Sequence, residues 1–399
     1  MKKKRIAFIT EFIPPYRKTF YQKLLTHSNY EWKIIHGLKE KEDGRPGHQG
    51  TFDFENHPVR YKEGKIGPFS VRWQAGILEK IKNWHPDIVI TQGIPSILSN
   101  WLAMDWAHRH GAKTITWHCG WEAQAGNPYS LPIKRWISQR YLSLVDRTLA
   151  YSTKAAAYLA ELQGGLAENI TVCYNGLEID PLLEKEGEYR AKGQALSQQE
   201  QVVQKKIFLY VGGILAEKRV PLLLKAFCNL SDNENAILWL VGDGPDLQKI
   251  IELAEALKMK NVKFWGRVIE DVDVFFAAAD YFVLPGIGGL ALNQALFWGL
   301  PCIVSDADGT EDDLVFENKT GFRFTPNDED SLKIALQKCL ALPDEQRINF
   351  GAAGRSLVLE RSNVNEMVKT FLMTIEQLTQ KMGMWFTENE IIDHEKLIN

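Results

Sequence analysis

Short apolar runs alternate with longer amphipathic stretches along most of this chain. In the first half, the apolar runs predict strands, and stretches with apolar residues three and four positions apart predict helices. The expected strands are 6–10, 32–36, 87–91, 113–117, 147–152 and 170–174. The expected helices lie near 16–26, 72–84, 96–110, 131–144 and 153–162. This alternation is typical of a parallel, doubly wound α/β sheet.

The alternation stops at 181–205, a polar stretch rich in Glu, Gln and Lys, which we interpret as a linker or surface insertion. A second series then predicts strands at 207–211, 237–241, 262–265, 281–284 and 301–305. Its helices are expected near 221–229, 245–258, 270–279, 290–298, 328–341, 345–356 and 363–381. The chain therefore divides into a first domain at 1–180 and a second at 206–374. The apolar residues of the tail, about 375–399, are expected to pack back on the first domain.

The length of 399 residues exceeds one ordinary core and agrees with two domains. The five cysteines are scattered without metal-ligand spacing, which favours reduced thiols in a cytoplasmic protein and no metal site. No run of 18 apolar residues exists, so we expect no membrane span.

Charge is distributed unevenly between the two halves. Residues 1–180 contain 24 Lys and Arg against 17 Asp and Glu, a net of +7, and the remainder has a net of −10. A basic first half suggests contact with an anionic lipid surface or a lipid diphosphate. An ordinary solvated surface is the alternative.

Glycine follows a predicted strand at three places in the second domain. The segments are 208–219 (FLYVGGILAEKR), 238–247 (LWLVGDGPDL) and 281–301 (YFVLPGIGGLALNQALFWGLP). Ligands of doubly wound sheets bind beyond the carboxyl ends of the strands, where glycine lets backbone N–H groups approach an anion. One such loop more often makes only a tight turn, but three on one sheet favour a phosphate-containing ligand.

A dinucleotide-dependent dehydrogenase is the first alternative that such loops suggest. Gly242-Asp243-Gly244 matches the start of the G-x-G-x-x-G motif, but the third glycine position is Leu247. The ribose-binding acid expected about 20 residues on is not clearly placed at the end of a second strand. Both departures count against a dehydrogenase.

Taken together, the segments resemble the family 4 glycosyltransferases, which are retaining enzymes of the GT-B fold. The matching motifs are G-x-x-x-x-E-K at 212–218, V-G-x-G-P at 241–245, F-x-G-x-V at 264–268, a glycine-rich loop at 286–290 and A-x-x-x-G-x-P at 295–301. VCYNGL at 172–177 and TGF at 320–322 are similar to two further family signatures. The resemblance implies two doubly wound, Rossmann-like domains that face each other across a cleft, with the acceptor side first and the nucleotide-sugar donor site second.

The resemblance also implies which residues form the site. Lys218 would bind the donor diphosphate, and His118 at a strand end would face the donor sugar; these two are the catalytic candidates. A purely structural role for His118 stays open. The further donor-binding candidates are Gly212, Gly213, Arg219, Gly242, Asp243, Gly244, Arg267, Val268, Gly286, Ile287, Gly288, Gly289, Leu290 and Gln294.

Three positions depart from the family pattern. Gly286 and Gln294 occupy the places of two glutamates that the family often has. Gly213 stands where a diphosphate-binding arginine is common, and Arg219 could substitute for it. Gln294 can still bond a ribose hydroxyl, because its amide offers both a donor and an acceptor.

Acceptor contacts are expected from the loop after the first strand. Pro15, Tyr16 and Arg17 could meet an acceptor sugar or phosphate, and Trp121 could stack on a sugar. A helix start at Pro15 and buried packing of the tryptophan are the alternatives. The basic, aromatic segment 131–144 could lie on an anionic membrane, although an ordinary surface helix has the same pattern.

We therefore predict transfer of a hexose-type sugar from a nucleotide diphosphate sugar, with retention of configuration. The acceptor is a saccharide, a lipid-linked molecule or a small molecule, as in the biosynthesis of cell-surface polysaccharide or glycolipid. No cofactor, metal or nucleic acid is expected, and the location is cytoplasmic with peripheral contact to the inner membrane face left open. A non-catalytic nucleotide-sugar binder and a GT-B epimerase are the alternatives.

Overall fold

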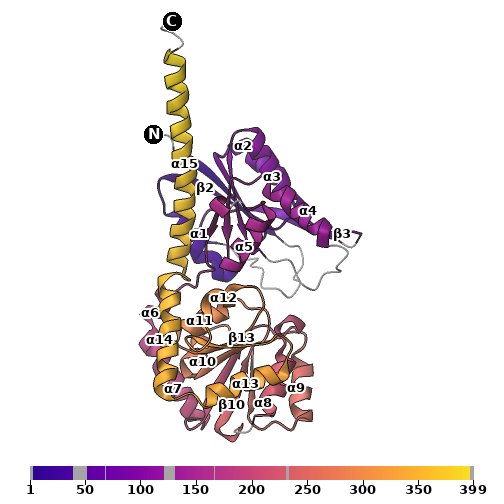
Figure 1. Cartoon of the computed structure of the whole chain (residues 1–399), viewed down its shortest axis with the longest axis vertical. Helices are drawn as coiled ribbons and strands as arrows, with labels where there is room; N and C mark the ends of the chain where they lie inside the picture. The colour runs from indigo at the N-terminus through magenta and orange to yellow at the C-terminus, as the bar shows by residue number, and fades with distance from the viewer. Residues whose placement is uncertain are drawn as a thin grey trace. The chain divides into compact units, whose positions relative to one another are not determined.

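The computed structural model describes residues 3–38, 52–67, 69–120, 131–165, 167–230 and 233–395. The chain forms two compact units (Figure 1). Unit 1 consists of Met1–Cys173 and Asn365–Asn399, and unit 2 consists of Tyr174–Val364.

Unit 1 is built on an eight-stranded sheet with the order β4-β3-β2-β1-β5-β6-β7-β8. The strands are β1 (Lys4–Thr10), β2 (Tyr30–Leu38), β3 (His57–Ile66), β4 (Phe69–Ala75), β5 (Ile88–Gln92), β6 (Lys113–His118), β7 (Arg147–Ala150) and β8 (Ile170–Val172). Strands β3 and β4 pair in antiparallel fashion, and the other pairs of this sheet are parallel. The strand order reverses between β1 and β5, so this sheet has its topological switch point there.

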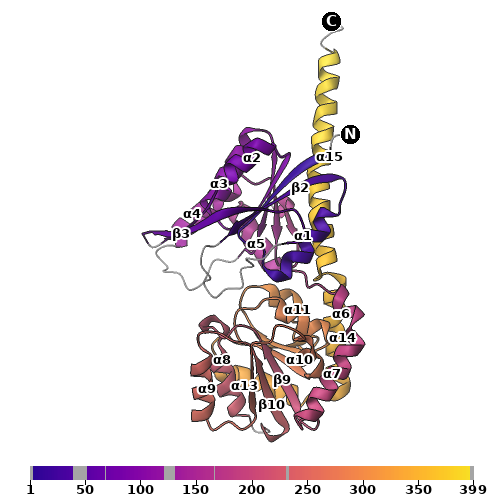
Figure 2. The ribbon, with the colours of Figure 1, turned by 180° about the vertical axis from the view of Figure 1, so that it is seen from behind.

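The helical segments of unit 1 connect and cover these strands (Figures 1 and 2). They are η1 (Pro15–Arg17), α1 (Lys18–Leu25), α2 (Ile77–Trp84), α3 (Leu98–Arg109), α4 (Leu131–Leu142), α5 (Thr153–Leu162), η3 (Ala167–Asn169) and α15 (Val364–Glu395). The last of them, α15, lies beside α1 in both views. Its Phe371 is fully buried and contacts the rings of Phe8, Phe20 and Trp117.

Unit 2 contains a six-stranded, fully parallel sheet with the order β11-β10-β9-β12-β13-β14. The strands are β9 (Lys206–Val211), β10 (Ala236–Val241), β11 (Val262–Gly266), β12 (Tyr281–Leu284), β13 (Cys302–Ser305) and β14 (Gly321–Phe324). Residues such as Leu209, Trp239 and Phe282 are fully buried in its core. The order reverses between β9 and β12, which is the switch point of the second sheet.

The helical segments of unit 2 lie on both faces of its sheet, as is usual for doubly wound folds (Figure 2). They are α6 (Asp180–Glu184), α7 (Glu186–Gln199), η4 (Ala216–Lys218), α8 (Val220–Cys228), η5 (Asn233–Asn235), α9 (Leu247–Ala256), α10 (Asp273–Ala278), α11 (Leu290–Phe297), α12 (Thr310–Leu314), α13 (Glu329–Leu340) and α14 (Asp344–Glu360).

The structure differs from the sequence-based expectation in unit 1 at β3 and β4. The sequence pattern predicts no strands there and places 72–75 in a helix. Val59 and Tyr61 are buried while their neighbours Arg60 and Lys62 are exposed. A half-buried hairpin with so many charged outer positions lacks the apolar run by which the other strands were recognised.

The expected linker at 181–205 is also different, because most of it forms α6 and α7 within unit 2. Tyr189 and Leu196 pack against the core of unit 2, and Glu186 forms an ion pair with Arg355 of α14 at 2.7 Å. Only a few apolar side chains of α7 contact the core, so the polar composition of this segment does not predict a packed helix. Helix α15 also continues past 381 to Glu395; Met382, Met384, Trp385 and Phe386, cited for the tail, lie outside the described side chains.

Candidate functional site

Three glycine-containing loops of unit 2 follow neighbouring parallel strands. They come after β9, β10 and β12, so they meet at the carboxyl edge of the sheet. The loops after β9 and β12 flank the switch point, where sheets of this type bind ligands. The structure therefore brings together the three segments that the sequence singled out.

The first two loops touch so closely that only glycine fits. A Cβ at Gly242 would lie 1.9 Å from the carbonyl oxygen of Gly212, and a Cβ at Gly244 would lie 2.3 Å from that of Ile214. The amide of Ile214 donates to the carbonyl oxygen of Asp243 at 2.9 Å. These glycines thus hold the two loops together, while the Asp243 residue between them is exposed.

Lys218 joins the loop after β9 to the loop after β12. Its Nζ donates to the carbonyl oxygens of Ile287 at 2.6 Å and Gly288 at 2.9 Å. An ammonium group has three N–H donors, so one remains for a ligand. Burial lowers the pKa of Lys218, whereas the carboxylates of Asp308 and Glu217 act in the opposite direction.

Gly286 has no room for the side chain that the family often has. A Cβ there would lie 2.1 Å from the carbonyl oxygen of Glu217 and 2.9 Å from Cα of Lys218. The amide of Ile287 also donates to the Glu217 carbonyl at 3.1 Å. In this chain, the backbone of the loop after β9 occupies the space that a glutamate side chain at 286 would need.

The glycine-rich loop leads directly into α11, which begins at Leu290 after Gly289. Within the described chain, no hydrogen bond uses the backbone N–H groups of Gly213, Gly288, Gly289 or Leu290. Free N–H groups at a helix N-terminus attract anions, because the helix dipole adds to their partial positive charge. This edge of the sheet can therefore hold a phosphate group.

Arg219 follows Lys218 and stands directly before α8, in a left-handed conformation with φ of 53°. Its Nη1 atom is buried and has no hydrogen-bond partner among the described residues. A buried, unsatisfied guanidinium nitrogen is costly unless a ligand or water meets it. Further along the same edge, Arg267 after β11 is exposed and Val268 packs against the core.

Gln294, on the second turn of α11, bonds to a residue that the sequence did not indicate. Its Nε2 donates to Oδ1 of Asp273 at 2.6 Å, and Nε1 of Trp298 donates to the same oxygen at 2.7 Å. Asp273 begins α10 and is only 7% exposed. Burial raises the pKa of Asp273, although these two hydrogen bonds favour its charged form.

The loop after β13 contains acidic residues that the sequence reasoning did not select. Asp308 Oδ2 would lie 3.6 Å from a Cβ at Gly288, and its charge acts on Lys218. Oxygens of Asp306, Glu311 and Asp312 lie within 4.8 Å of one another. Arg323 forms ion pairs with Asp306 and, at 2.6 Å, with Asp312, so the cluster is at least partly neutralised within the protein. In the sequence, these acidic residues follow directly after the strand predicted at 301–305, and this position is the signal that could have indicated them.

In unit 1, His118 ends β6 and is 6% exposed. Its Nδ1 accepts a hydrogen bond from the amide of Gly120 at 2.8 Å, so the hydrogen of the neutral ring resides on Nε2. That Nε2 is buried and has no partner in the part of the chain that the structure describes. Burial lowers the pKa of His118 to about 4, which keeps the ring neutral at pH 7.

The loop after β1 contains the acceptor-side candidates Pro15, Tyr16 and Arg17. Arg17 is 5% exposed, its Nη1 contacts Sδ of Met367 at 3.1 Å, and its guanidinium lies 4.5 Å from the ring centre of Trp117. It therefore packs inward, and contact of Arg17 with an acceptor stays a prediction. Pro15 begins η1, Tyr16 is 54% exposed, and Trp121 lies outside the described residues.

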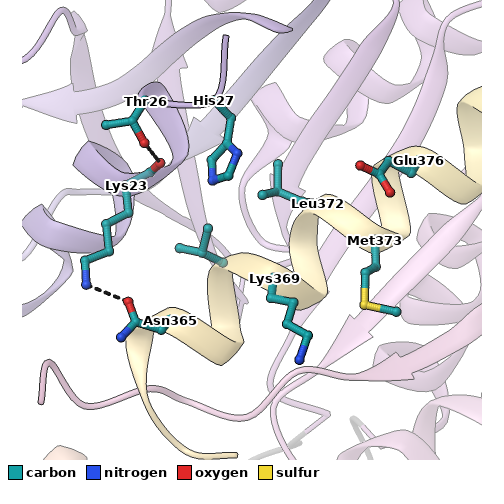
Figure 3. Close-up of a pocket in the computed structure, with 9 residues that line it drawn as sticks. Lys23, Thr26, His27, Asn365, Lys369, Leu372, Met373 and Glu376 are labelled. Atoms are coloured by element: carbon teal, nitrogen blue, oxygen red, sulfur yellow. Dashed lines mark hydrogen bonds between the residues drawn. The ribbon is translucent and has the colours of Figure 1, made fainter. Parts of the chain in front are cut away.

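A groove of about 520 Å³ lies elsewhere on unit 1, between the end of α1 and the start of α15 (Figure 3). Lys23 donates to Asn365 at 2.6 Å, and Lys369 pairs with Glu366 at 3.1 Å. The residues that line this groove include none of the expected site residues that the structure describes. Nowhere in the described chain is a helix both long and apolar enough to cross a membrane.

Two family models match the chain, and the boundary between them, at 181–193, lies close to the boundary between units 1 and 2 after Cys173. Residues 41–181 match the model of Glycosyltransferase Family 4, and residues 193–357 match that of Glycosyl transferases group 1. The N-acetyl-alpha-D-glucosaminyl L-malate synthase of Bacillus anthracis is 28% identical over 171 residues, 42% of this chain and 44% of that protein. The chain spans about half the length of the curated relatives it matches.

Solved structures share the whole architecture. Anabaena HepE in complex with UDP has a TM-score of 0.71 at 14% identity, covering 94% of this chain and 100% of that one. The lipopolysaccharide outer core galactosyltransferase WaaB has a TM-score of 0.69 at 17% identity, covering 94% and 99%. These structures and the two parallel-sheet units confirm the GT-B fold class.

Proposed function

Because its family matches and its fold indicate a glycosyltransferase of the GT-B, family 4 type, we propose that this chain transfers a hexose-type sugar from a UDP-sugar to an acceptor, with retention of configuration. The observation on which the proposal chiefly rests is Lys218. This half-buried cation is held by two carbonyl oxygens at the switch point of unit 2 and keeps one N–H for a ligand. The UDP complexes of HepE support uridine as the nucleoside.

The proposed chemistry depends on charge that develops on the leaving group. As the bond from the sugar to the diphosphate breaks, negative charge accumulates on the phosphate oxygens and the sugar becomes cation-like. Lys218, Arg219 and the N–H groups at 213 and 288–290 would stabilise that charge, and preorganised donors of this kind usually make the largest contribution. No covalent nucleophile or metal ion is required in this scheme.

His118 is proposed to bind a substrate hydroxyl as a neutral donor. Its Nε2–H is buried and unsatisfied within the described chain, which is the state in which a hydroxyl oxygen would be bound most strongly. Because its pKa is about 4, the histidine would position the substrate without adding charge at pH 7. The other donor-binding candidates named from the sequence are proposed to contact the nucleotide diphosphate sugar, as the family resemblance implies.

Acceptor binding is assigned to unit 1, with Pro15 and Tyr16 as candidates and with Arg17 as a supporting residue. The acceptor is proposed to be a saccharide or lipid-linked molecule of the cell surface, which the likeness to WaaB supports. Helix α4 exposes Ile133 and Trp136 next to Lys134 and Arg135, and this pattern supports contact with an anionic membrane. Sedimentation with phosphatidylglycerol vesicles tests this contact; equal recovery without vesicles would exclude it.

The donor site is tested by thermal unfolding of the full chain with UDP-, GDP-, dTDP- and ADP-sugars. We expect a selective increase in Tm with a UDP-sugar, which Lys218→Ala abolishes and Lys225→Ala retains. Lys225 is an exposed residue of the adjacent α8 and serves as the matched control. UDP release in the presence of acceptor should fall by about 100-fold or more in Lys218→Ala, as for loss of a charge-stabilising donor. Near-normal release would refute this mechanism.

A non-catalytic nucleotide-sugar binder is the second candidate. It is favoured by Gly286, which cannot accommodate a glutamate because Glu217 lies too close. Such a protein would show the Tm increase without any donor turnover, even with a broad panel of acceptors. The same assay therefore separates the two candidates.

A further inference from the structure

Asp273 is a buried carboxylate beside the glutamine that replaces a family glutamate. It lies at the start of α10, and Gln294 lies on α11, which is next to α10 in unit 2 (Figures 1 and 2). One oxygen of Asp273 accepts hydrogen bonds from both Nε2 of Gln294 at 2.6 Å and Nε1 of Trp298 at 2.7 Å. Two neutral donors thus converge on one carboxylate oxygen.

This arrangement determines which way the amide of Gln294 faces. A carboxylate only accepts hydrogen bonds, so the NH₂ group of Gln294 must point toward Asp273. The amide oxygen, Oε1, then points away from Asp273. In the described chain, Oε1 has no hydrogen bond and is not among the buried unsatisfied atoms, so it is not fully enclosed by the protein.

We propose that Asp273 is a positioning residue that holds Gln294 with its amide oxygen toward the donor nucleotide, where it accepts a hydrogen bond from a ribose hydroxyl. This inference rests on the proposed function. The amide oxygen offers the same acceptor as a carboxylate but adds no negative charge near the diphosphate. The pair therefore selects nucleotides that have free ribose hydroxyls, despite the absence of the family glutamate.

The carboxylate of Asp273 requires a hydrogen-bond donor at position 294, and glutamine supplies one. A glutamate at 294 would place a second carboxylate at the position from which Nε2 now donates, 2.6 Å from Oδ1 of Asp273. Asp271, which pairs with Lys192 at 2.9 Å, also acts on Asp273 with negative charge. A third carboxylate in this place would be repelled by both. Glutamine at 294 is thus what the buried aspartate requires.

The test measures the Kd of UDP, 2′-deoxy-UDP and 3′-deoxy-UDP by calorimetry on the full chain. We expect wild type to prefer UDP over at least one deoxy analogue by roughly 10-fold, as for one hydrogen bond to a ligand. In Asp273→Ala this preference should fall to about 2-fold or less, because Gln294 is no longer oriented. Trp298→Phe removes the other hydrogen bond to Asp273 and should retain the preference.

A charge exchange provides a second measurement. Gln294→Glu should weaken UDP binding and lower Tm, whereas the double variant Asp273→Asn with Gln294→Glu should recover part of both losses. In the double variant, the carboxamide at 273 can turn its NH₂ group toward the new carboxylate at 294, but Trp298 then loses its acceptor, because Trp298 and position 294 meet the same atom of residue 273. A preference unchanged in Asp273→Ala, or no recovery in the double variant, would overturn the inference while leaving UDP binding intact. Wild type that binds no nucleotide would overturn the proposed function itself.

Discussion

At the scale of single residues, burial determines the chemical state of His118. The amide of Gly120 fixes its tautomer, and desolvation lowers its pKa from 6.5 to about 4. A histidine whose pKa is depressed in the folded state binds its proton more readily in the unfolded chain. Folding is therefore linked to pH through this side chain.

The sign of that linkage gives a prediction. Between pH 6.5 and 4 the unfolded chain takes up a proton that the folded chain does not, so His118 makes stability fall as pH falls and has no effect above 6.5. The contribution is at most about 3 kcal/mol. We expect His118→Gln to reduce the pH dependence of unfolding in this window, measured by urea titration from about pH 7.5 to about 4.5.

His27→Gln is the control, because His27 is exposed on the surface of unit 1. Its pH profile should match that of wild type. His57 also has a pKa lowered by burial, so some pH dependence remains in every variant. Profiles of wild type and His118→Gln that coincide would contradict the assignment of His118.

At the scale of elements, α7 shows how a polar helix becomes part of a core. Gly193 is buried where α7 meets α10, and a Cβ there would lie 2.9 Å from backbone atoms of Ala277 and Ala278. Gly187, in the first turn of the same helix, has nothing within 4 Å of its Cβ position. The two glycines thus differ in packing although they share one helix.

Two alanine substitutions test this packing. Gly193→Ala should lower the free energy of unfolding by about 1–3 kcal/mol, because the helices must separate. Gly187→Ala should raise it by up to about 1 kcal/mol, because alanine favours the helix. Urea unfolding measures both. If residues 181–205 were a detached linker, the two variants would behave alike, and that result would exclude the packing described for α7.

At the scale of the whole molecule, the chain leaves unit 1 after Cys173 and returns to it at Asn365. The returning helix, α15, supplies Phe371 to a cluster with Phe8, Phe20 and Trp117, in which its ring lies 5.0 Å from that of Phe20 and 5.7 Å from that of Phe8. It also supplies Met367, which contacts the buried Arg17. Unit 1 therefore requires both ends of the chain.

Removal of the Phe371 ring tests this dependence. Phe371→Ala should destabilise unit 1 by about 3–5 kcal/mol, the usual cost of deleting a buried phenyl ring. Met373, on the same helix, is 50% exposed, so Met373→Ala should change stability by less than about 0.5 kcal/mol. Tryptophan fluorescence during urea unfolding follows both units, since Trp117 lies in unit 1 and Trp239, Trp265 and Trp298 lie in unit 2, and the transition that Phe371→Ala shifts should be that of unit 1. Equal effects of the two variants would mean that α15 is not part of this core.

Local patterns were sufficient for most of the fold. The strands expected at 6–10, 207–211 and 281–284 are β1, β9 and β12, because continuous apolar runs bounded by glycine or helix signals have few other interpretations. The three glycine loops were also visible in the sequence, since backbone contact excludes side chains there. Fold class and the place of the candidate donor site therefore followed from sequence alone.

Contacts between distant residues were decided only by the tertiary structure. Arg17 was expected at the acceptor but packs on Met367, and Gln294 was expected at a ribose but also bonds to Asp273 on another helix. Nothing near either residue in the sequence specifies these partners, because a side chain takes the orientation that packing and hydrogen bonding across elements leave available. The sequence by itself was enough to predict most of the strands and the three glycine loops at which an anion is proposed to bind. The tertiary structure decided which polar groups are already paired within the protein and which remain for a substrate.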